Sequence, residues 1–522
     1  MSRELAALGR QTPRRTVLLC TEGTYPYASG GVSRWCDVLC TELSDVDYVL
    51  YVLTGLPEVS VHYELPASIR EIVHVPLWGT QDPFEYAFAH DGLRDVLRRR
   101  RRTTRGIIER TFLPLFARLL GALRDGDGSV KTGGVLHAMW RYFHRHDWNR
   151  TWRSPSVWES FVANALHRDV NDRELLPHEQ PRAEDLTMSL RCLRNLLLPL
   201  AGAVPRADVV HSTVAGSASL PGILAKHEHG TPFVLTEHGV LVRERYMSMA
   251  ADELSHHTSR FLARLSVLLA RLSYSHADAI APVAEFNQRW EIALGADPDR
   301  IETIYNGIDT AVYRPRPKPS SRSRPTVVAA ARVFPLKDIE TMIGAAAVAR
   351  EALPEVQFVV YGSVEADPCY VARCRALIAK LGLENTFELA GMHSNSAEIY
   401  LEGDISVLSS ISEGVPYAVL ESLSCGRPVV ATDVGGVSEI LQGYGTLVPP
   451  RDPRRLGEAV VALLVDDARR MELGRQGREW VLKRFQTEQT VDAYRRLYGR
   501  LAAPLLEARP GDPAAAPAVV VA

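Results

Sequence analysis

The stretch SEGVPYAVLES, residues 412–422, carries two glutamates in an otherwise largely apolar segment. Glu413 and Glu421 stand eight positions apart, and Pro416 lies between them. Because proline lacks an N–H and its fixed φ suits the first helical position, this pattern predicts a helix that begins at Pro416. Glu413 would then lie on the preceding loop, and Glu421 about a turn and a half into the helix.

The start of this helix suits an anion. The amides of Tyr417 and Ala418 would point out of the first turn, where backbone N–H groups lack partners within the helix. Two carboxylates beside such a site suggest a ligand that carries both phosphate and hydroxyl groups. A capped surface helix with two solvated glutamates explains the stretch equally well, so the segment alone leaves both interpretations open.

Composition narrows the class of protein. The chain has 522 residues, 46% hydrophobic and 23% charged, which predicts a globular protein with two sizeable domains. A formal net charge of -2 argues against general nucleic-acid binding, which needs an excess of positive charge. The seven cysteines form no CxxC pair, and Cys36 and Cys40 have no histidine cluster near them in sequence. We therefore expect a reduced, cytoplasmic protein without a structural metal.

No segment has the pattern of a signal peptide or a membrane span. The first residues, MSRELAALGRQTPRRT, contain no apolar stretch of signal-peptide length. The most apolar run, residues 196–204, is shorter than the roughly 18 residues that a spanning helix needs. Contact with the inner face of a membrane would have to come through a partner or a surface patch.

The first half of the chain reads as a doubly wound α/β domain with an insertion. Apolar runs at 15–23 and 47–55 flank a helical pattern and predict a βαβ unit with a ligand crevice at the strand carboxyl ends. From about 87 to 200 the strand signals stop, and the pattern predicts a helical insertion rich in Arg and Trp. Strands and helices then alternate again through ADVVHSTVAG, TPFVLTEHG, ADAIAPVAEFNQRW and IETIYNGID.

The second half repeats this alternation after a linker. YRPRPKPSSRSRP, residues 313–325, has no periodicity and predicts an interdomain linker. Strand patterns follow in TVVAAARV, VQFVVYGSV, TFELAGM, ISVLSS, PVVATDVGG and GTLVPP. We thus expect a first domain over 1–312, a second over 326–486, a helix over 487–507 that could return to the first domain, and a disordered tail over 508–522. Two such domains would face a cleft.

Several motifs together resemble one family. EGVPYAVLE has the E-x7-E pattern of retaining GT-B glycosyltransferases of family 4, and CGRPVVATDVGGVSEI follows at the expected distance. NGID comes before the linker and ARVFPLKD opens the second domain, as in that family. EGTYPYASGGVSRW and TEHGVLVRERY in the first half resemble the PelF-like subgroup, cytosolic glycosyltransferases of exopolysaccharide systems. The resemblance covers nearly all of the second domain and the core elements of the first.

This resemblance implies roles for the charged residues. Arg332 and Lys337 would hold the donor diphosphate and neutralise the leaving group, since breaking a sugar–phosphate bond builds negative charge on the departing oxygen. Glu413 would contact the sugar, and Glu421 the ribose hydroxyls. The donor-binding set implied is Gly30, Gly31, Arg332, Lys337, Glu413, Gly414, Pro416, Tyr417, Ala418 and Glu421. For the Arg/Lys pair the competing interpretation is two solvated surface charges.

Residues of the first domain complete the predicted site. Gly30 and Gly31 precede a helix start, where the lack of side chains lets backbone approach a phosphate, although a Gly-Gly pair is also typical of turns. His238, in TEHG at a strand end, matches the family's histidine near sugar and acceptor, and is assigned to the catalytic set with Glu413, Arg332 and Lys337. For His211, in a similar setting, a structural role is the preferred interpretation.

No metal or other cofactor is expected. The sequence has no DxD-type carboxylate pair in a plausible place, and the DPD at 297–299 is typical of a polar turn. The resemblance implies a donor held by basic side chains and helix ends, with front-face displacement in which the leaving phosphate takes the acceptor's proton.

Two features of the insertion stay open. The run Arg98 to Arg102, followed by Arg105, could meet an acidic lipid or a polyanionic partner, or could be a solvated helix face. Aromatic residues between Trp140 and Trp158 could bind a glycan, although helix packing is the usual role of such residues.

Together these observations predict a retaining, metal-independent hexosyltransferase. It would move a hexose from a nucleoside diphosphate sugar, UDP-glucose or a related UDP-sugar, to a growing exopolysaccharide, with a membrane-embedded synthase complex as a conceivable partner. Alternatives are a family 4 enzyme with a glycolipid, small-metabolite or α-glucan acceptor, or a non-catalytic nucleotide-sugar-binding subunit of a synthase complex.

Overall fold

The computed structural model describes residues 14–86, 88, 91–166, 181–249, 254–317, 324–365 and 367–507. The expected tail at 508–522 and much of the expected linker lie outside this part of the chain. Contacts divide the molecule into two units, one made of residues 1–282, 288–302 and 494–522 and the other of 283–287 and 303–493. Each unit contains one six-stranded parallel sheet, described below by itself.

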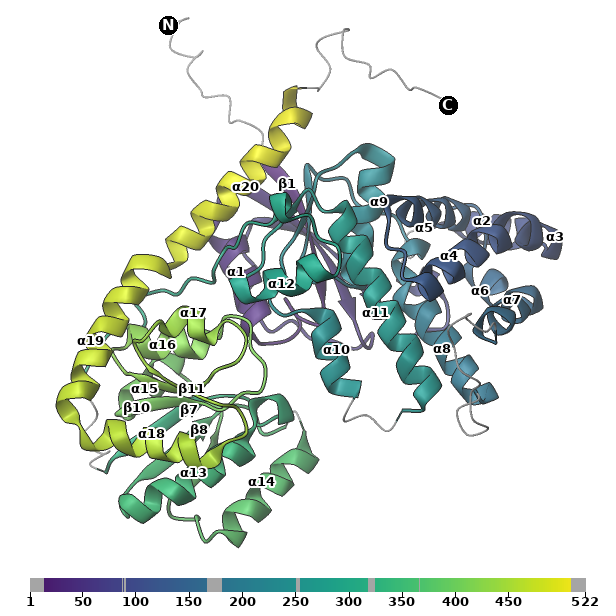
Figure 1. Cartoon of the computed structure of the whole chain (residues 1–522). Coiled ribbons are helices and arrows are strands. Elements are labelled where there is room, and N and C mark those ends of the chain that lie inside the picture. The colour runs from purple at the N-terminus through teal and green to yellow at the C-terminus, as the bar shows by residue number, and fades with distance from the viewer. Residues whose placement is uncertain are drawn as a thin grey trace, which may run out of the picture. The chain divides into compact units, whose positions relative to one another are not determined.

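The first sheet, whose strand β1 is labelled in Figure 1, has the strand order β3-β2-β1-β4-β5-β6. Apart from the edge strand β3, its strands are largely buried and rich in Val, Leu and Ile, as expected for a parallel sheet covered on both faces. Their bounds are β1 Arg15–Glu22, β2 Val46–Thr54, β3 Ile69–Pro76, β4 Val209–Ser212, β5 Phe233–Leu235 and β6 Ala279–Ile280.

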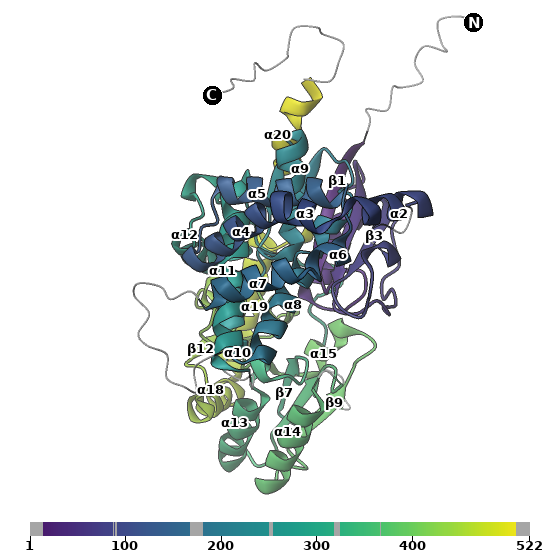
Figure 2. The same ribbon diagram turned by 90° about the vertical axis from the view of Figure 1, so that its right-hand side faces the viewer.

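Only helical elements lie between β3 and β4 in the described part of the chain, so the predicted helical insertion is confirmed. Figure 2 shows α2 to α7 grouped together. The bounds are η2 Pro83–Glu85, α2 Leu93–Arg102, α3 Arg105–Ile107, η3 Ile108–Phe112, α4 Leu113–Asp125, α5 Val130–Phe143, α6 Trp148–Trp152, α7 Pro155–Ala165, α8 Ala183–Leu196 and η5 Leu198–Ala201. The other helices of this unit are α1 Gly31–Glu42, η6 Ser217–Ser219, α9 Leu220–His229, α10 Leu241–Met249, α11 His256–His276, α12 Glu285–Ala293 and η7 Pro298–Arg300.

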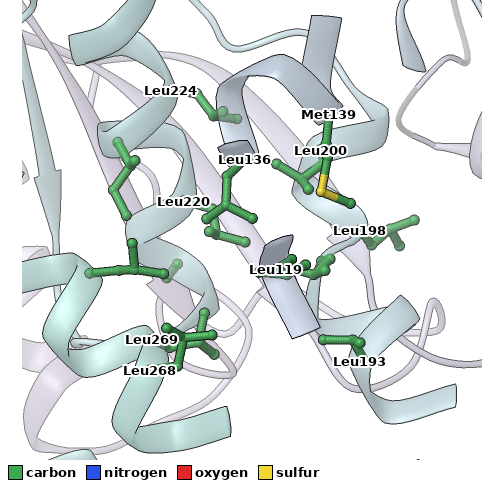
Figure 3. Close-up of a cluster of buried hydrophobic side chains, with 14 of the residues drawn as sticks. Leu119, Leu136, Met139, Leu193, Leu198, Leu200, Leu220, Leu224, Leu268 and Leu269 are labelled. Atoms are coloured by element: carbon green, nitrogen blue, oxygen red, sulfur yellow. The ribbon is translucent and has the colours of Figure 1, made fainter. Parts of the chain in front are cut away.

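The insertion shares one hydrophobic core with the sheet. Figure 3 shows Leu136 and Met139 of α5 near Leu220 and Leu224 of α9, with Leu119, Leu193, Leu198, Leu200, Leu268 and Leu269 around them. Trp148 and Trp152 are also buried in this core. Because its helices bury their apolar faces against the covering helices α9 and α11, the insertion is an integral part of the first unit.

The second sheet has the order β12-β11-β10-β7-β8-β9. Its strands are β7 Thr326–Ala330, β8 Gln357–Tyr361, β9 Phe387–Gly391, β10 Ile405–Leu408, β11 Val429–Thr432 and β12 Thr446–Val448. The helices are η8 Pro335–Lys337, α13 Ile339–Ala352, α14 Pro368–Lys380, α15 Ser396–Glu402, α16 Tyr417–Ser424, α17 Val437–Leu441, α18 Pro453–Val465, α19 Asp467–Arg484 and α20 Thr487–Glu507. The predicted fold class, two doubly wound Rossmann-like domains with a helical insertion in the first, is confirmed.

Two details differ from the sequence predictions. IETIYNGID forms no strand, only two isolated bridges, from Ile301 to Ile280 and from Ile308 to Gln486. The chain enters the second unit at 303, ahead of the linker expected at 313–325. Tyr313, the expected first linker residue, is buried there, and its carbonyl oxygen accepts hydrogen bonds of 2.6 Å from Ser424 and from Arg478. Residues of α20 up to 493 group with the second unit and those from 494 with the first.

Candidate active site

The second sheet has its topological switch point between β7 and β10. These two strands are parallel neighbours, and their chain continuations run to opposite sides of the sheet. In open α/β sheets a ligand crevice forms at the carboxyl ends of strands at such a point. Lys337 follows β7, and Glu413 follows β10, so the fold brings two predicted site residues to this edge.

Lys337 and Glu413 form an ion pair. The Lys337 Nζ lies 2.5 Å from Oε1 of Glu413, and the Ser410 hydroxyl donates to the same oxygen, also at 2.5 Å. The side chains are 26% and 11% exposed, so the pair is partly accessible. The sequence analysis assigned Lys337 to phosphate and Glu413 to sugar; the structure shows that these two side chains form one ion pair.

Arg332 also follows β7, in the loop before η8. Its side chain is exposed and has no ion pair or hydrogen bond among the residues that the structure describes. A guanidinium with no internal partner remains available to an incoming anion.

The helix α16 begins one residue later than predicted. Pro416 is the N-cap, with an extended backbone (φ -73, ψ 119), and Tyr417 and Ala418 are the first helical residues. Proline is tolerated as the N-cap, as it would be at the first helical position, because neither position needs an N–H for a hydrogen bond within the helix. The first turn of α16 carries no acidic side chain, so its positive end is not internally neutralised.

Glu421 lies in α16 and is only 6% exposed. Its Oε2 accepts a hydrogen bond of 2.5 Å from the hydroxyl of Tyr400, which is fully buried. Burial and the neighbouring Glu421 carboxylate raise the pKa of Tyr400 well above its usual value. Glu421 therefore has a structural partner in the protein, whatever it does toward a ligand.

Gly435 and Gly436 fix the loop that carries Glu413. Gly435 has φ +58, and a Cβ there would lie 1.7 Å from the carbonyl oxygen of Glu413. The amide of Gly436 donates to the carbonyl of Gly414 at 3.1 Å. The two loops touch backbone to backbone, which only glycine permits at this distance and φ. The TDVGG sequence thus supports the Glu413–Gly414 turn directly.

In the first unit, α1 begins one residue earlier than predicted. Gly31 is its first residue, and Gly30 is the N-cap, with extended backbone and no side-chain cap. A Cβ at Gly30 would meet no atom within 4 Å, so the space beside this helix start is open.

His238 lies just after β5, and its ring packs edge-on against Trp35 with centroids 4.8 Å apart. Its Nε2 is buried and has no hydrogen-bond partner among the described residues. Burial lowers the pKa of His238 to about 3, so the imidazole is neutral near pH 7. A neutral ring with an unused nitrogen can donate or accept one hydrogen bond from a ligand.

His211 differs from His238 because both of its ring nitrogens are engaged. Nδ1 lies 2.7 Å from the Tyr498 hydroxyl and Nε2 lies 2.8 Å from the Thr236 hydroxyl. Burial, and then the neighbouring His238, lower the pKa of His211 to about 3. These contacts fit the structural role preferred in the sequence analysis.

A buried acid pair next to His238 was not anticipated. Glu237 and Glu291 are both fully buried, and the Tyr274 hydroxyl donates to Glu237 at 2.5 Å. No donor group in the described part of the chain reaches either oxygen of Glu291, whose hydrogen-bonding neighbour is the Glu237 carboxyl. Two carboxylates can bond only through a proton, and burial raises the pKa of both. No sequence signal links them, since they stand far apart in the chain.

Within the described residues, no cluster of three or more His, Cys, Asp or Glu side chains could hold a metal. All seven cysteines are free thiols. No helix in the described ranges is long and apolar enough to cross a membrane.

Two protein families match this chain, one in each of its halves. The chain belongs to the family described as Domain of unknown function (DUF3492), whose model matches residues 15–299, more than half of it. Residues 314–480 match the model Glycosyl transferases group 1, so the second unit carries a domain of that group, and the fold is GT-B.

The chain also resembles individual proteins in sequence and in structure. The chain is 28% identical to Alpha-maltose-1-phosphate synthase of Mycolicibacterium smegmatis over 62% of its length and 88% of the relative. It is 27% identical to D-inositol 3-phosphate glycosyltransferase of Segniliparus rotundus, over 65% and 76%. The crystal structure of Anabaena HepE in complex with UDP and glucose superposes with a TM-score of 0.57 at 14% identity, covering 93% of this chain and 100% of that one.

Proposed function

We propose that this protein is a retaining glycosyltransferase that moves a hexose from UDP-glucose or a related UDP-sugar to a growing exopolysaccharide. The observation that carries this proposal is the Lys337–Glu413 pair at the switch point of the second sheet. It sets a cation for phosphate beside an anion for sugar. The match to Glycosyl transferases group 1 covers the same residues, and a structural neighbour was crystallised with UDP and glucose.

The chemistry follows from the charges. When the bond between the anomeric carbon and the phosphate oxygen breaks, negative charge grows on the departing UDP. Lys337, Arg332 and the positive end of α16 would stabilise that charge. The acceptor hydroxyl attacks from the same face, and the leaving phosphate oxygen takes its proton, which retains the anomeric configuration.

Glu413 would steady the positive charge that develops at the anomeric carbon, since its carboxylate is fixed by two hydrogen bonds. Glu421 would hold the ribose hydroxyls. His238, neutral and with one unused nitrogen, would serve toward the sugar or acceptor as a hydrogen-bonding group, not as a cation. We assign the reaction no metal: these cations and helix ends would supply the charge that a metal provides elsewhere.

A small phosphorylated acceptor is the second candidate, because both relatives named above are named for such compounds. Incubation with a panel of UDP-sugars, with and without a polysaccharide, a glycolipid or a sugar phosphate, would distinguish the two by which acceptor stimulates UDP release. If no donor is turned over while UDP-sugars still raise the melting temperature, the protein is a binding subunit and the enzymatic proposal is wrong.

A further inference from the structure

The helical insertion contains a hollow of about 420 Å³ that the proposed reaction does not use. Its wall comes from η2, α2, α3, α6 and α7 and from the segments that join them, all within the first unit. Its volume falls within the range of small-molecule sites in proteins, roughly 300–1,000 Å³. Among the lining residues are four arginines, Arg100, Arg105, Arg150 and Arg153.

The two acidic side chains in the wall are already occupied. Asp147 accepts a hydrogen bond of 2.6 Å from the Arg150 amide as the cap of α6. Asp82 accepts a short hydrogen bond from the side chain of Asn149. With four arginines and two aspartates, the hollow has an excess of two positive charges.

Three of the four arginines have no anionic partner among the described residues, and two of these have no side-chain partner at all. Arg105 pairs with Glu109 at 2.7 Å, and Arg150 donates to the carbonyl of Arg100 at 2.6 Å. The side chains of Arg100 and Arg153 form no ion pair or hydrogen bond with the residues that the structure describes. Exposed guanidinium groups that line one hollow and outnumber its acidic side chains favour an anion, because their like charges repel each other when it is empty.

A further cation stands behind the wall. Arg194 is half-buried and donates only to amide oxygens, at 2.7 Å to Asn149 and 3.0 Å to Asn195. Burial, and then the positive charge of Arg153, lower the pKa of Arg194 to about 10. Asn149 lines the hollow, so only this one side chain separates the Arg194 guanidinium from the hollow, and its charge adds to the positive potential there.

We infer that this hollow binds a phosphate-bearing ligand. Glu109 offsets Arg105, and Arg194 behind the wall adds one charge, so the surroundings of the hollow keep an excess of two positive charges. This excess matches a phosphate group, which carries about -1.5 to -2 near neutral pH, better than a single carboxylate. The planar guanidinium fork fits phosphate oxygens in pairs. The ligand could be a soluble phosphorylated compound or the phosphate head of a lipid-linked one; the chemistry that recognises it is the same. This inference is independent of the proposed transferase reaction.

The same helix provides a matched control. Arg98 and Arg101 line a separate hollow on α2 together with Arg94, Leu97 and Arg102. A double variant Arg100→Gln/Arg153→Gln and a double variant Arg98→Gln/Arg101→Gln remove equal charge from the insertion. Only the first changes the phosphate hollow.

The experiment titrates inorganic pyrophosphate into the full-length protein by calorimetry, with UDP present at saturation so that the predicted donor site is filled. Wild type and the Arg98→Gln/Arg101→Gln variant should bind. Arg100→Gln/Arg153→Gln should bind at least about tenfold more weakly, since each charged hydrogen bond contributes on the order of one decade in affinity. A parallel arm tests vesicles of phosphatidylcholine with and without phosphatidic acid.

Vesicle binding that is lost in the Arg100/Arg153 variant, and kept in the control variant, would support the hollow with a lipid source for its phosphate. Equal loss in both variants, in either arm, would show a diffuse charge effect and overturn the inference, as would absence of binding by wild type in both arms. Without ligand, Arg100→Gln/Arg153→Gln should be no less stable than wild type because it relieves repulsion. If the melting temperature falls while pyrophosphate binding is unchanged, Arg100 and Arg153 have a structural role and the proposed phosphate site is wrong.

Discussion

Replacing Glu413 by glutamine should abolish most turnover and leave UDP binding intact. Glutamine keeps the shape of the side chain and one oxygen acceptor, and removes only the negative charge. If Glu413 stabilises positive charge that grows at the anomeric carbon, kcat should fall by about 10²-fold, as for other transition-state electrostatic contacts. The donor KM should change little, because the charge exists mainly in the transition state.

The contacts of Glu413 also predict how the Glu413→Gln variant changes the stability of the fold and the affinity for UDP. Glu413 accepts from Lys337 and Ser410 at 2.5 Å each, with its side chain 11% exposed. A charged hydrogen bond that is partly screened contributes about 1 to 2 kcal/mol, so the variant should melt a few degrees lower. Lys337 loses its internal partner, and UDP affinity should therefore stay the same or rise.

The assay combines donor-saturation kinetics with UDP calorimetry. Ser410→Ala is the control, since it removes one hydrogen bond from Glu413 and keeps the charge; its kcat should fall far less. Lys337→Met should weaken UDP binding. The reasoning is refuted if Glu413→Gln keeps kcat within about threefold while its UDP affinity falls by tenfold, the loss on the order expected of a phosphate contact.

Three further predictions concern the rest of the site. Glu421→Ala should lower both UDP affinity and stability, because it also leaves the buried hydroxyl of Tyr400 without an acceptor. Tyr400→Phe should lower stability alone. Equal loss of UDP affinity in both variants would mean that Glu421 has a structural role only. Activity should survive excess EDTA, and complete loss that Mg²⁺ or Mn²⁺ restores would contradict the assignment without metal. Burial raises the pKa values of Glu237 and Glu291 in the folded protein. The pair therefore stabilises the fold fully below the ordinary glutamate pKa and loses this contribution as pH rises through the pKa values of the folded state. The free energy of unfolding should fall by up to about 1.4 kcal/mol per pH unit for one proton. Glu291→Gln, which can donate to Glu237 without ionising, should flatten the fall in unfolding free energy between pH 6 and 9; an unchanged slope would mean that the pair does not share a proton.

The sequence predicted the elements whose signal is local. Eleven of the twelve strands were expected, because short apolar runs bounded by glycine or turn residues mark buried parallel strands. The strand β3, IREIVHVP, was missed: it lies at the sheet edge, and its exposed Arg70 and Glu71 lie at a shift in the pairing register, so its pattern is weak. IETIYNGID contains β-branched residues, which favour strands. The chain passes from one unit to the other within this segment, so its position in the fold outweighs its strand propensity.

Contacts between distant residues were beyond sequence reasoning. The spacing of Glu413 and Glu421 predicted a loop residue and a helical one, and the structure has them so. That Lys337 is the partner of Glu413, and Tyr400 that of Glu421, depends on the strand order and on loop geometry. The acid pair of Glu237 and Glu291 has no motif at all.

The contact between Gly435 and the Glu413 carbonyl means that this site can be lost without losing any charged residue. A methyl group at position 435 would need the space that the carbonyl oxygen of Glu413 occupies, and a φ of +58 that alanine adopts only with strain. The loop would have to move, and with it the carboxylate opposite Lys337. A homologous sequence that keeps both glutamates, the lysine and the arginine, and has any larger residue at the position of Gly435, should therefore be classed as a silent copy, whatever its motif suggests. We therefore expect activity in such chains to require the glycine after TDV as well as the acids.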